Sequence, residues 1–173
     1  MYSTVGEDYT TPATIRKTGG VVPDEHWEEN RHLARITAAL AGQMGLKAAN
    51  AHAGFLPHDP ADPDFDKLCG RVLTLAEVFA EQGVTLLMET GQETAETLLA
   101  FLGEMKARGA ENIAVNFDPA NMILYGSGEP IEALRKIGHY VRSVHCKDAT
   151  WAARPGEEWG REVPLGQGSV GFE

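Results

Sequence analysis

Four residues that can bind a metal ion or move a proton recur at regular intervals along the sequence. His52, Glu89, Asp118 and His145 each stand at the end of a short stretch that we expect to be a β-strand, and they are 37, 29 and 27 residues apart. Each interval is close to the roughly 30 residues of one strand–helix–strand unit. Imidazole and carboxylate groups suit a divalent ion with mixed nitrogen and oxygen ligands, such as Mn²⁺, Mg²⁺, Co²⁺ or Zn²⁺.

The elements that would position these residues alternate along the chain. Apolar runs predict strands over residues 47–52, 84–88, 113–117 and 141–146. Apolar residues at helical spacing predict helices that begin near residues 24, 65, 95 and 130. Strict alternation implies a parallel sheet, and the carboxyl ends of parallel strands meet on one face, where ligands bind. We therefore expect one α/β domain over residues 1–173, with residues 1–23 as loop and the four strand-end residues in one pocket.

Each of these residues also has an ordinary structural interpretation. Asp118 precedes Pro119 and would make a good helix N-cap. His52 would fit equally well as a core histidine bonded to backbone. Recurrence at equivalent positions in consecutive units favours the joint functional interpretation over four separate structural ones.

The segment after the last predicted strand gives weaker signals. Lys147 and Asp148 are either a solvated charge pair or groups that orient a substrate or support the metal site. The run Gly166-Gln167-Gly168 is a weak phosphate-binding signal, with a flexible loop as the alternative. Strand alternation turns Cys146 away from His145, so we expect it to be a small core residue.

Composition and length limit the functions available. The chain has 173 residues and a formal net charge of -10, which disfavours nucleic acid and anionic membranes as partners. Two well-separated cysteines, no leader-like N-terminus and no long apolar run predict a soluble cytoplasmic protein. A complete eight-unit barrel needs about 250 residues, at least about 200, and this chain is shorter.

Several motifs resemble one family. They are METGQE at 88–93, NFDPANM at 116–122, VHCKD at 144–148 and PLGQGSV at 164–170, with AHAGF at 51–55. Together they resemble the sugar phosphate isomerase/epimerase family, over roughly residues 20–172. The resemblance implies the xylose isomerase-like (β/α)₈ barrel, of which this chain would hold about four to five of the eight units.

The resemblance also implies roles for individual residues. Glu89, Asp118 and His145 match metal ligands, and Glu89 matches the proton-transfer base of the ketose epimerase branch. His52 matches a pocket histidine that contacts substrate, or metal in the endonuclease branch.

Two departures from the family pattern follow. Asn121 stands where several members carry a histidine, which disfavours the trinuclear-zinc DNA-repair branch. We expect Asn121, like His52 and Lys147, to contact substrate, with Lys147 near the developing oxyanion or a hydroxyl. The family's fourth metal ligand is a glutamate that ends the eighth strand, and Glu173 does not match it.

The expected function is therefore metal-dependent isomerisation or epimerisation of a small sugar, sugar phosphate or cyclitol, by proton transfer through an enediolate. We expect weak or absent turnover from this chain alone. An inosose-type dehydratase is one alternative, and a non-catalytic partial barrel that binds a ligand or partner is another. Open sheet edges at both ends favour self-association into a homo-oligomer.

Overall fold

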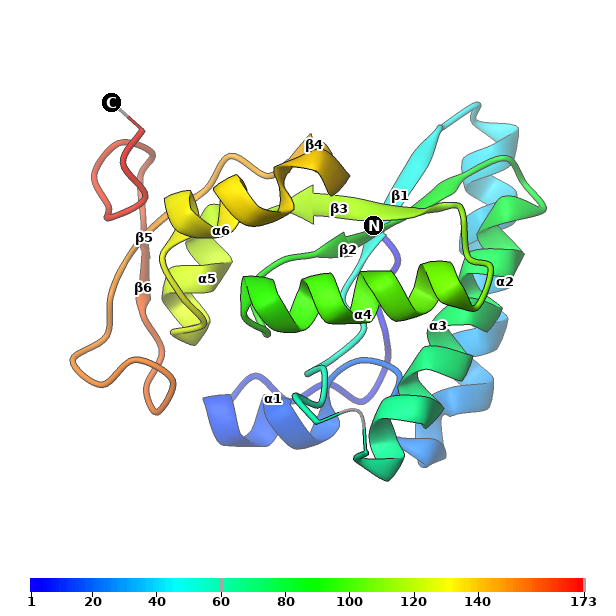
Figure 1. Ribbon diagram of the computed structural model, residues 1–173, viewed down its shortest axis with the longest axis horizontal. Coiled ribbons are helices and arrows are strands. Elements are labelled where there is room, and N and C mark those ends of the chain that lie inside the picture. Colours follow the sequence, from blue (N-terminus) through cyan, green and yellow to red (C-terminus); the bar gives the residue numbers. More distant parts are fainter. Residues whose placement is uncertain (60, 173) are drawn as a thin grey trace.

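A parallel four-stranded sheet forms the centre of the molecule (Figure 1). The computed structural model describes residues 1–59 and 61–172. The strands are β1 (Ala48–Ala51), β2 (Thr85–Glu89), β3 (Ile113–Phe117) and β4 (Val141–Val144), paired in that order. All four predicted strands are present, with ends shifted by two residues or fewer. The middle strands are almost fully buried, which explains their continuous apolar sequences.

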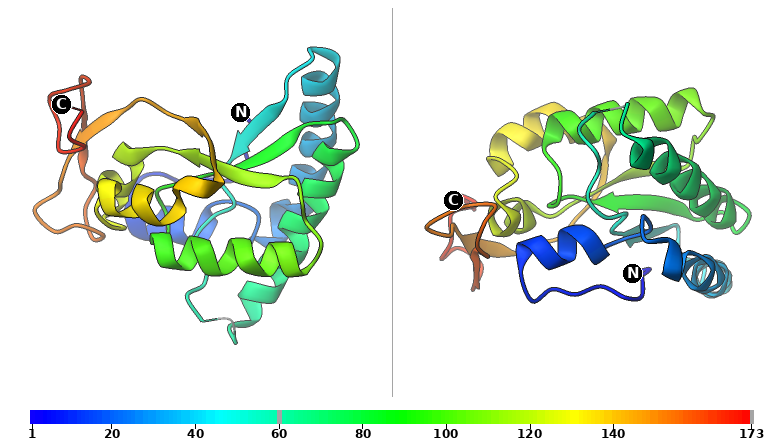
Figure 2. Two further views of the ribbon diagram at one scale, coloured as in Figure 1. Left: turned by 45° about the horizontal axis from the view of Figure 1, so that its top comes forward. Right: turned by 90° about the horizontal axis from the view of Figure 1, so that it is seen from below.

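Four helices cover the sheet and pack one beside the next (Figures 1 and 2). They are α2 (Trp27–Gln43), α3 (Pro63–Ala80), α4 (Ala95–Ala107) and α6 (Pro130–Ile137). Asp62 and Thr94 cap α3 and α4 with side-chain oxygens that accept backbone N–H groups. Short 3₁₀ turns precede α2 at Asp24–His26 and β4 at Gly138–Tyr140. The main apolar core lies between these helices and the sheet.

The sheet is open and does not close into a barrel. A cavity of about 610 Å³ lies against it, lined in part by Asn50, Leu87 and Asn116 from the three strands β1 to β3. Beyond β1, Tyr2 forms a single parallel bridge with Ala51, and its N–H donates to the Asn50 carbonyl at 2.9 Å. The architecture is that of consecutive β/α units of an incomplete parallel barrel, as the sequence predicts.

Three segments differ from the prediction. Residues 1–23 are not all loop, because α1 (Pro12–Thr18) begins after a Thr11 cap and buries Ile15. A further helix, α5 (Pro119–Tyr125), follows β3 directly. The polar segment after β4 contains a small antiparallel pair, β5 (Asp148–Thr150) and β6 (Arg161–Val163). Within the described residues, no helix has the length and apolar character to cross a membrane.

Candidate metal centre

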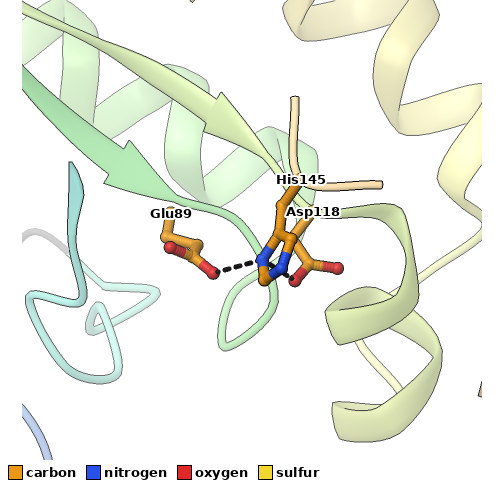
Figure 3. Close-up of side chains that lie close together, drawn as sticks. All are labelled: Glu89, Asp118 and His145. Carbon is orange, nitrogen blue, oxygen red and sulfur yellow. Dashed lines mark hydrogen bonds and ion pairs between the residues drawn. The ribbon is translucent and has the colours of Figure 1, made fainter. Parts of the chain in front are cut away.

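Three of the predicted residues converge at the carboxyl ends of neighbouring strands (Figure 3). Glu89 ends β2, Asp118 follows β3, and His145 follows β4. One ligand atom from each lies within 4.8 Å of the others. His145 Nδ1 is 3.4 Å from Glu89 Oε1 and 3.0 Å from Asp118 Oδ2. The parallel register brings these positions together although 56 residues separate Glu89 from His145 along the chain.

Backbone and hydroxyl contacts hold the strand ends together. Thr90 Oγ1 donates to the Asp118 carbonyl at 2.9 Å and accepts the Asp118 N–H at 2.8 Å. The His145 N–H donates to the Phe117 carbonyl at 2.9 Å. The backbone that carries Asp118 is therefore held from both neighbouring strands.

The two carboxylate oxygens of Asp118 have different surroundings. Oδ1 accepts the Asn121 N–H at 2.9 Å, so Asp118 is the N-cap of α5. Oδ2 has no aligned hydrogen bond within the described part of the chain, although His145 Nδ1 and Lys147 Nζ each lie 3.0 Å away. The side chain is completely buried. A buried anionic oxygen without an aligned donor is suited to bind a cation. Both interpretations of Asp118 from the sequence are thus compatible.

Glu89 is surrounded by polar side chains. Oε1 lies 3.4 Å from Asn121 Nδ2 and 3.8 Å from His52 Nε2, while Oε2 accepts a hydrogen bond from Asn50 Nδ2. Only 6% of the residue is exposed. Asn50 was not among the predicted site residues. Asn50 lies in β1 and His52 follows the strand directly, so strand alternation continued to His52 predicts both on one face, and this is the signal that would have found Asn50.

Lys147 supplies a positive charge at the centre. Nζ lies 3.0 Å from Asp118 Oδ2 and 2.5 Å from Asn121 Oδ1, and only 17% of the side chain is exposed. Lys147 is therefore not part of a solvated charge pair. Two carboxylates face one ammonium group, which leaves a net charge of −1 when the imidazoles are neutral.

The donor set fits a divalent metal ion. Two carboxylate oxygens and one imidazole nitrogen are ligand types that Mn²⁺, Mg²⁺, Co²⁺ and Zn²⁺ all accept. The His145 side chain is 52% exposed, so the centre opens to solvent on that side. Three protein ligands would leave coordination positions for substrate.

A second buried carboxyl group lies in the loop after β2. Glu93 is 7% exposed, and burial raises its pKa to about 8 although its own backbone N–H opposes the shift. No separate role was predicted for Glu93, and its burial is what distinguishes it from surface glutamates. It is a proton-binding group close in sequence to Glu89.

Asp148 has a structural role. Its Oδ2 accepts the N–H groups of Gly166 and Gly168 at 2.9 and 2.8 Å, and its Oδ1 accepts those of Ala149 and Val170 at 2.9 and 3.2 Å. Burial opposes ionisation, but these four N–H groups together lower the pKa of Asp148. An internal carboxylate therefore occupies the N–H groups that a phosphate would need, and the phosphate interpretation of residues 166–168 is not supported.

The prediction for Cys146 was wrong. The residue is exposed, because β4 ends at Val144 and its alternation does not extend to position 146. The expectation for Glu173 lies outside the described residues.

Comparison with known proteins agrees with the fold and the motifs. The model of the xylose isomerase-like TIM barrel family matches residues 13–173, and the chain belongs to this family. A crystal structure of a xylose isomerase domain protein from Planctomyces limnophilus matches with a TM-score of 0.90 and 43% identity, over 96% of this chain and 60% of that chain. The Escherichia coli protein YihM is 30% identical over 97 residues, which are 56% of this chain and 29% of YihM.

More distant structures show the same fold. A magnesium complex of a xylose isomerase-like TIM barrel protein from Mycobacterium smegmatis has a TM-score of 0.68 and 20% identity, over 86% of this chain and 55% of that chain. Others, at 18% to 22% identity, are D-allulose and L-ribulose 3-epimerases and a probable 3-DHS dehydratase. The chain thus spans at most about three-fifths of the length of these relatives.

Proposed function

We propose that residues 1–173 form one partial barrel domain that carries the metal-binding part of a sugar isomerase or epimerase. The observation that carries this proposal is the convergence of Glu89, Asp118 and His145 at three neighbouring strand ends. The substrate would be a small sugar, sugar phosphate or cyclitol. The epimerases among the structural neighbours support this assignment, and so does the magnesium bound in another neighbour, the Mycobacterium smegmatis protein.

The reaction requires removal of a proton from a carbon next to a carbonyl group. A divalent ion held by Glu89, Asp118 and His145 would polarise the substrate carbonyl. Glu89 is the proposed base, and hydrogen bonds from Asn50 and Asn121 hold its carboxylate in position. Orientation by these two amides contributes to the rate because the carboxylate need not be ordered during the reaction.

Three other residues would contact the substrate. Lys147 places its ammonium group where negative charge develops on the enediolate oxygen. His52 Nδ1 is buried and has no hydrogen-bond partner in the described part of the chain, so it remains available to a substrate hydroxyl. The Asn121 amide contacts Glu89 through its nitrogen and Lys147 through its oxygen, so it would contact a substrate held between these two residues.

The charges of the centre fit an intermediate with one negative charge. Glu89, Asp118 and Lys147 sum to −1, and a divalent cation changes the sum to +1. When the substrate proton moves to Glu89, the Glu89 carboxyl becomes neutral, the enediolate carries one negative charge, and the total stays at +1. The new negative charge would lie beside the divalent ion and the Lys147 ammonium, which would stabilise the intermediate more than the neutral substrate, as catalysis requires.

We expect low turnover from this chain by itself. The family resemblance implies a fourth ligand, a glutamate that also serves as a second acid/base, and the described residues offer three ligands at this centre. The relatives contain further chain that would supply the remaining strands. A homo-oligomer formed through the open edges of β1 and β4 is the corresponding proposal for its assembly.

Calorimetric titration with Mn²⁺ tests the metal centre. We expect one ion per chain, with binding lost in Glu89→Gln, Asp118→Asn and His145→Ala and kept in the exposed control Glu132→Gln. Solvent deuterium exchange into a panel of ketoses tests the reaction, and exchange should require Glu89. Mn²⁺ binding that is unchanged by all three ligand substitutions would refute the proposal.

Dehydration of an inosose-type cyclic polyol is the second candidate. The dehydratase among the structural neighbours supports it, and the same base would remove the first proton. Loss of water from a cyclic polyol can be monitored through the absorbance of the unsaturated product. Its appearance would distinguish a dehydratase from an enzyme that exchanges the substrate proton with solvent without eliminating water. A non-catalytic ligand-binding role would show neither product nor exchange.

A further inference from the structure

A cleft of about 320 Å³ lies beside the metal centre, and the proposed proton transfer does not use it. Its walls come from the N-terminal segment, α5 and the β5–β6 hairpin: Tyr9, Asn121, Leu124, Tyr125, Trp159, Gly160 and Glu162. Asn121 belongs to the cleft and also contacts Glu89 and Lys147. The cleft therefore begins at a residue of the candidate metal centre.

The cleft extends from Asn121 along one face of α5. Asn121, Leu124 and Tyr125 are three and four residues apart, so they lie on the same side of the helix. Four residues correspond to about 6 Å along a helix axis. A ligand bound against Tyr125 and Trp159 would thus lie about one helical turn beyond the reacting unit.

Aromatic side chains form its surface. Tyr125 and Trp159 contact edge to face, with ring centroids 5.0 Å apart and planes at 76°. Phe55 continues the row with its centroid 5.8 Å from that of Tyr125. Tyr9 is 46% exposed at the cleft. Aromatic side chains of this kind offer a large apolar surface together with a polar atom, a combination that suits a ring with apolar C–H faces and hydroxyl groups at its edge.

The β5–β6 hairpin, whose connecting segment carries Trp159, lies beside α5 (Figure 1). Gly160 donates its N–H to the Leu124 carbonyl at 3.2 Å, and a Cβ at this position would lie 2.7 Å from the Thr150 carbonyl oxygen. Gly126, at a φ of +67°, packs against the Gly156 backbone in the same hairpin. The hairpin therefore approaches α5 through two glycines, and the cleft exists without a ligand.

The charge of the cleft favours a neutral ligand. Glu162 is the one charged residue among those that line it, and none of them is lysine or arginine. The nearby Lys147 already contacts Asp118 and Asn121. A phosphate or carboxylate would meet a like charge, whereas a sugar hydroxyl would donate to the Glu162 carboxylate.

We propose that this cleft is a subsite for a second, neutral sugar ring, so that the substrate is a glycoside or short oligosaccharide with its reacting unit at the metal centre. The position of the reacting unit rests on the proposed function. The subsite itself is a binding claim, and it is tested without turnover.

Tryptophan fluorescence reports binding in the proteins that keep Trp159, and calorimetric titration reports it in the Trp159 variants, both with the whole chain in EDTA and again with Mn²⁺. The probes are glucose, cellobiose, maltose, lactose and glucose 6-phosphate. We expect saturable quenching by at least one disaccharide, about three- to tenfold tighter than by glucose and not improved by phosphate. Trp159→Ala should abolish binding, Trp159→Phe should keep part of the affinity, and Glu162→Gln should weaken the affinity without changing the melting temperature. Trp151→Phe is the matched control and should bind like the parent.

Because some variants could lose stability, binding is interpreted for Trp159→Phe and Glu162→Gln when their melting curves match the parent. Equal affinity for glucose and for the disaccharides would overturn the proposal. So would tighter binding of glucose 6-phosphate than of glucose. Quenching in EDTA that persists while Mn²⁺ binding and ketose exchange are absent would refute the proposed function alone. Exchange without any disaccharide response would refute the subsite alone.

Discussion

Lys147 Nζ lies 3.0 Å from Asp118 Oδ2, the buried oxygen that also faces His145 Nδ1 at 3.0 Å. One carboxylate oxygen therefore serves a fixed ammonium group and a candidate metal position at once. Without a divalent ion, Lys147 is the main counter-charge to two carboxylates, Asp118 and Glu89, that are almost inaccessible to solvent. The contribution of Lys147 to the stability of the fold should therefore depend on whether the ion is bound.

Lys147→Met should destabilise the metal-free protein and strengthen metal binding. Loss of the ammonium leaves Asp118 buried without its counter-charge, at a cost of about 3 kcal/mol in the free energy of unfolding. A divalent ion then meets no competing cation, so the Mn²⁺ dissociation constant should fall about tenfold. Urea unfolding with and without Mn²⁺, together with calorimetric titration, measures both effects.

Lys67→Met is the matched control for this prediction. Lys67 pairs with Asp64 at 2.9 Å on the surface of α3, and such exposed pairs contribute about 1 kcal/mol or less. Neither variant should alter the helix content. A Lys147→Met protein that is as stable as the parent in EDTA would contradict the charge argument.

Thr90→Val should weaken metal binding from outside the ligand set. The substitution keeps the shape but removes the hydroxyl that donates to the Asp118 carbonyl and accepts the Asp118 N–H. We expect a loss of about 1–2 kcal/mol in stability and about three- to tenfold in Mn²⁺ affinity, because Asp118 loses a fixed position. Thr74→Val removes a hydroxyl bond within α3, far along the chain from the centre, and should change stability alone.

The strand-end residues could be predicted because their positions depend on a local pattern repeated in each unit. A buried strand followed by a polar residue is visible in the sequence. Parallel pairing of the strands then brings Glu89, Asp118 and His145 together at one edge of the sheet. Asn121 and Lys147 were expected at the site from the family motifs, and the structure places both beside Asp118. Their chemical roles remain proposals.

The features that escaped prediction depend on contacts between distant segments. Asp148 binds N–H groups up to 22 residues away, and nothing local distinguishes it from a surface aspartate. Helix α1 has one buried hydrophobic side chain besides Pro12, so it shows no apolar periodicity. The aromatic row depends on a hairpin that reaches α5 through Gly160, a contact that no local pattern indicates.

Asp148→Asn should loosen the 164–170 loop and reduce the acid sensitivity of the fold. The pKa of Asp148 is lowered in the folded state, so its stabilisation is present above the usual carboxyl pKa and is lost as the pH falls through the folded value. At pH 7 we expect a loss of about 2 kcal/mol, since a charged acceptor of four N–H groups is replaced by a neutral one. The difference between parent and variant should shrink at low pH.

Urea unfolding between pH 3 and pH 8 measures this difference, and hydrogen exchange at Gly166 and Gly168 localises it. Asp8→Asn provides the comparison, because the exposed Asp8 accepts hydrogen bonds from Thr10 and should give a much smaller change. A difference that stays constant across this range would show that the ionised carboxylate is not the stabilising group.

Glu93→Gln should stabilise the protein at alkaline pH. Burial raises the pKa of Glu93 from 4.5 to about 8, so the folded state keeps a proton that the unfolded chain has already released. For a group whose folded pKa is raised, stability is complete below the unfolded pKa and is lost as the pH rises through the folded one. The parent should therefore lose a few kcal/mol between about pH 4.5 and pH 8, and the glutamine variant should lose much less. Melting temperatures across pH 5 to pH 9 measure this loss, with the exposed Glu96→Gln as control. Parallel pH profiles for Glu93→Gln and the parent would contradict the prediction, because they would show that the buried carboxyl ionises without cost in stability.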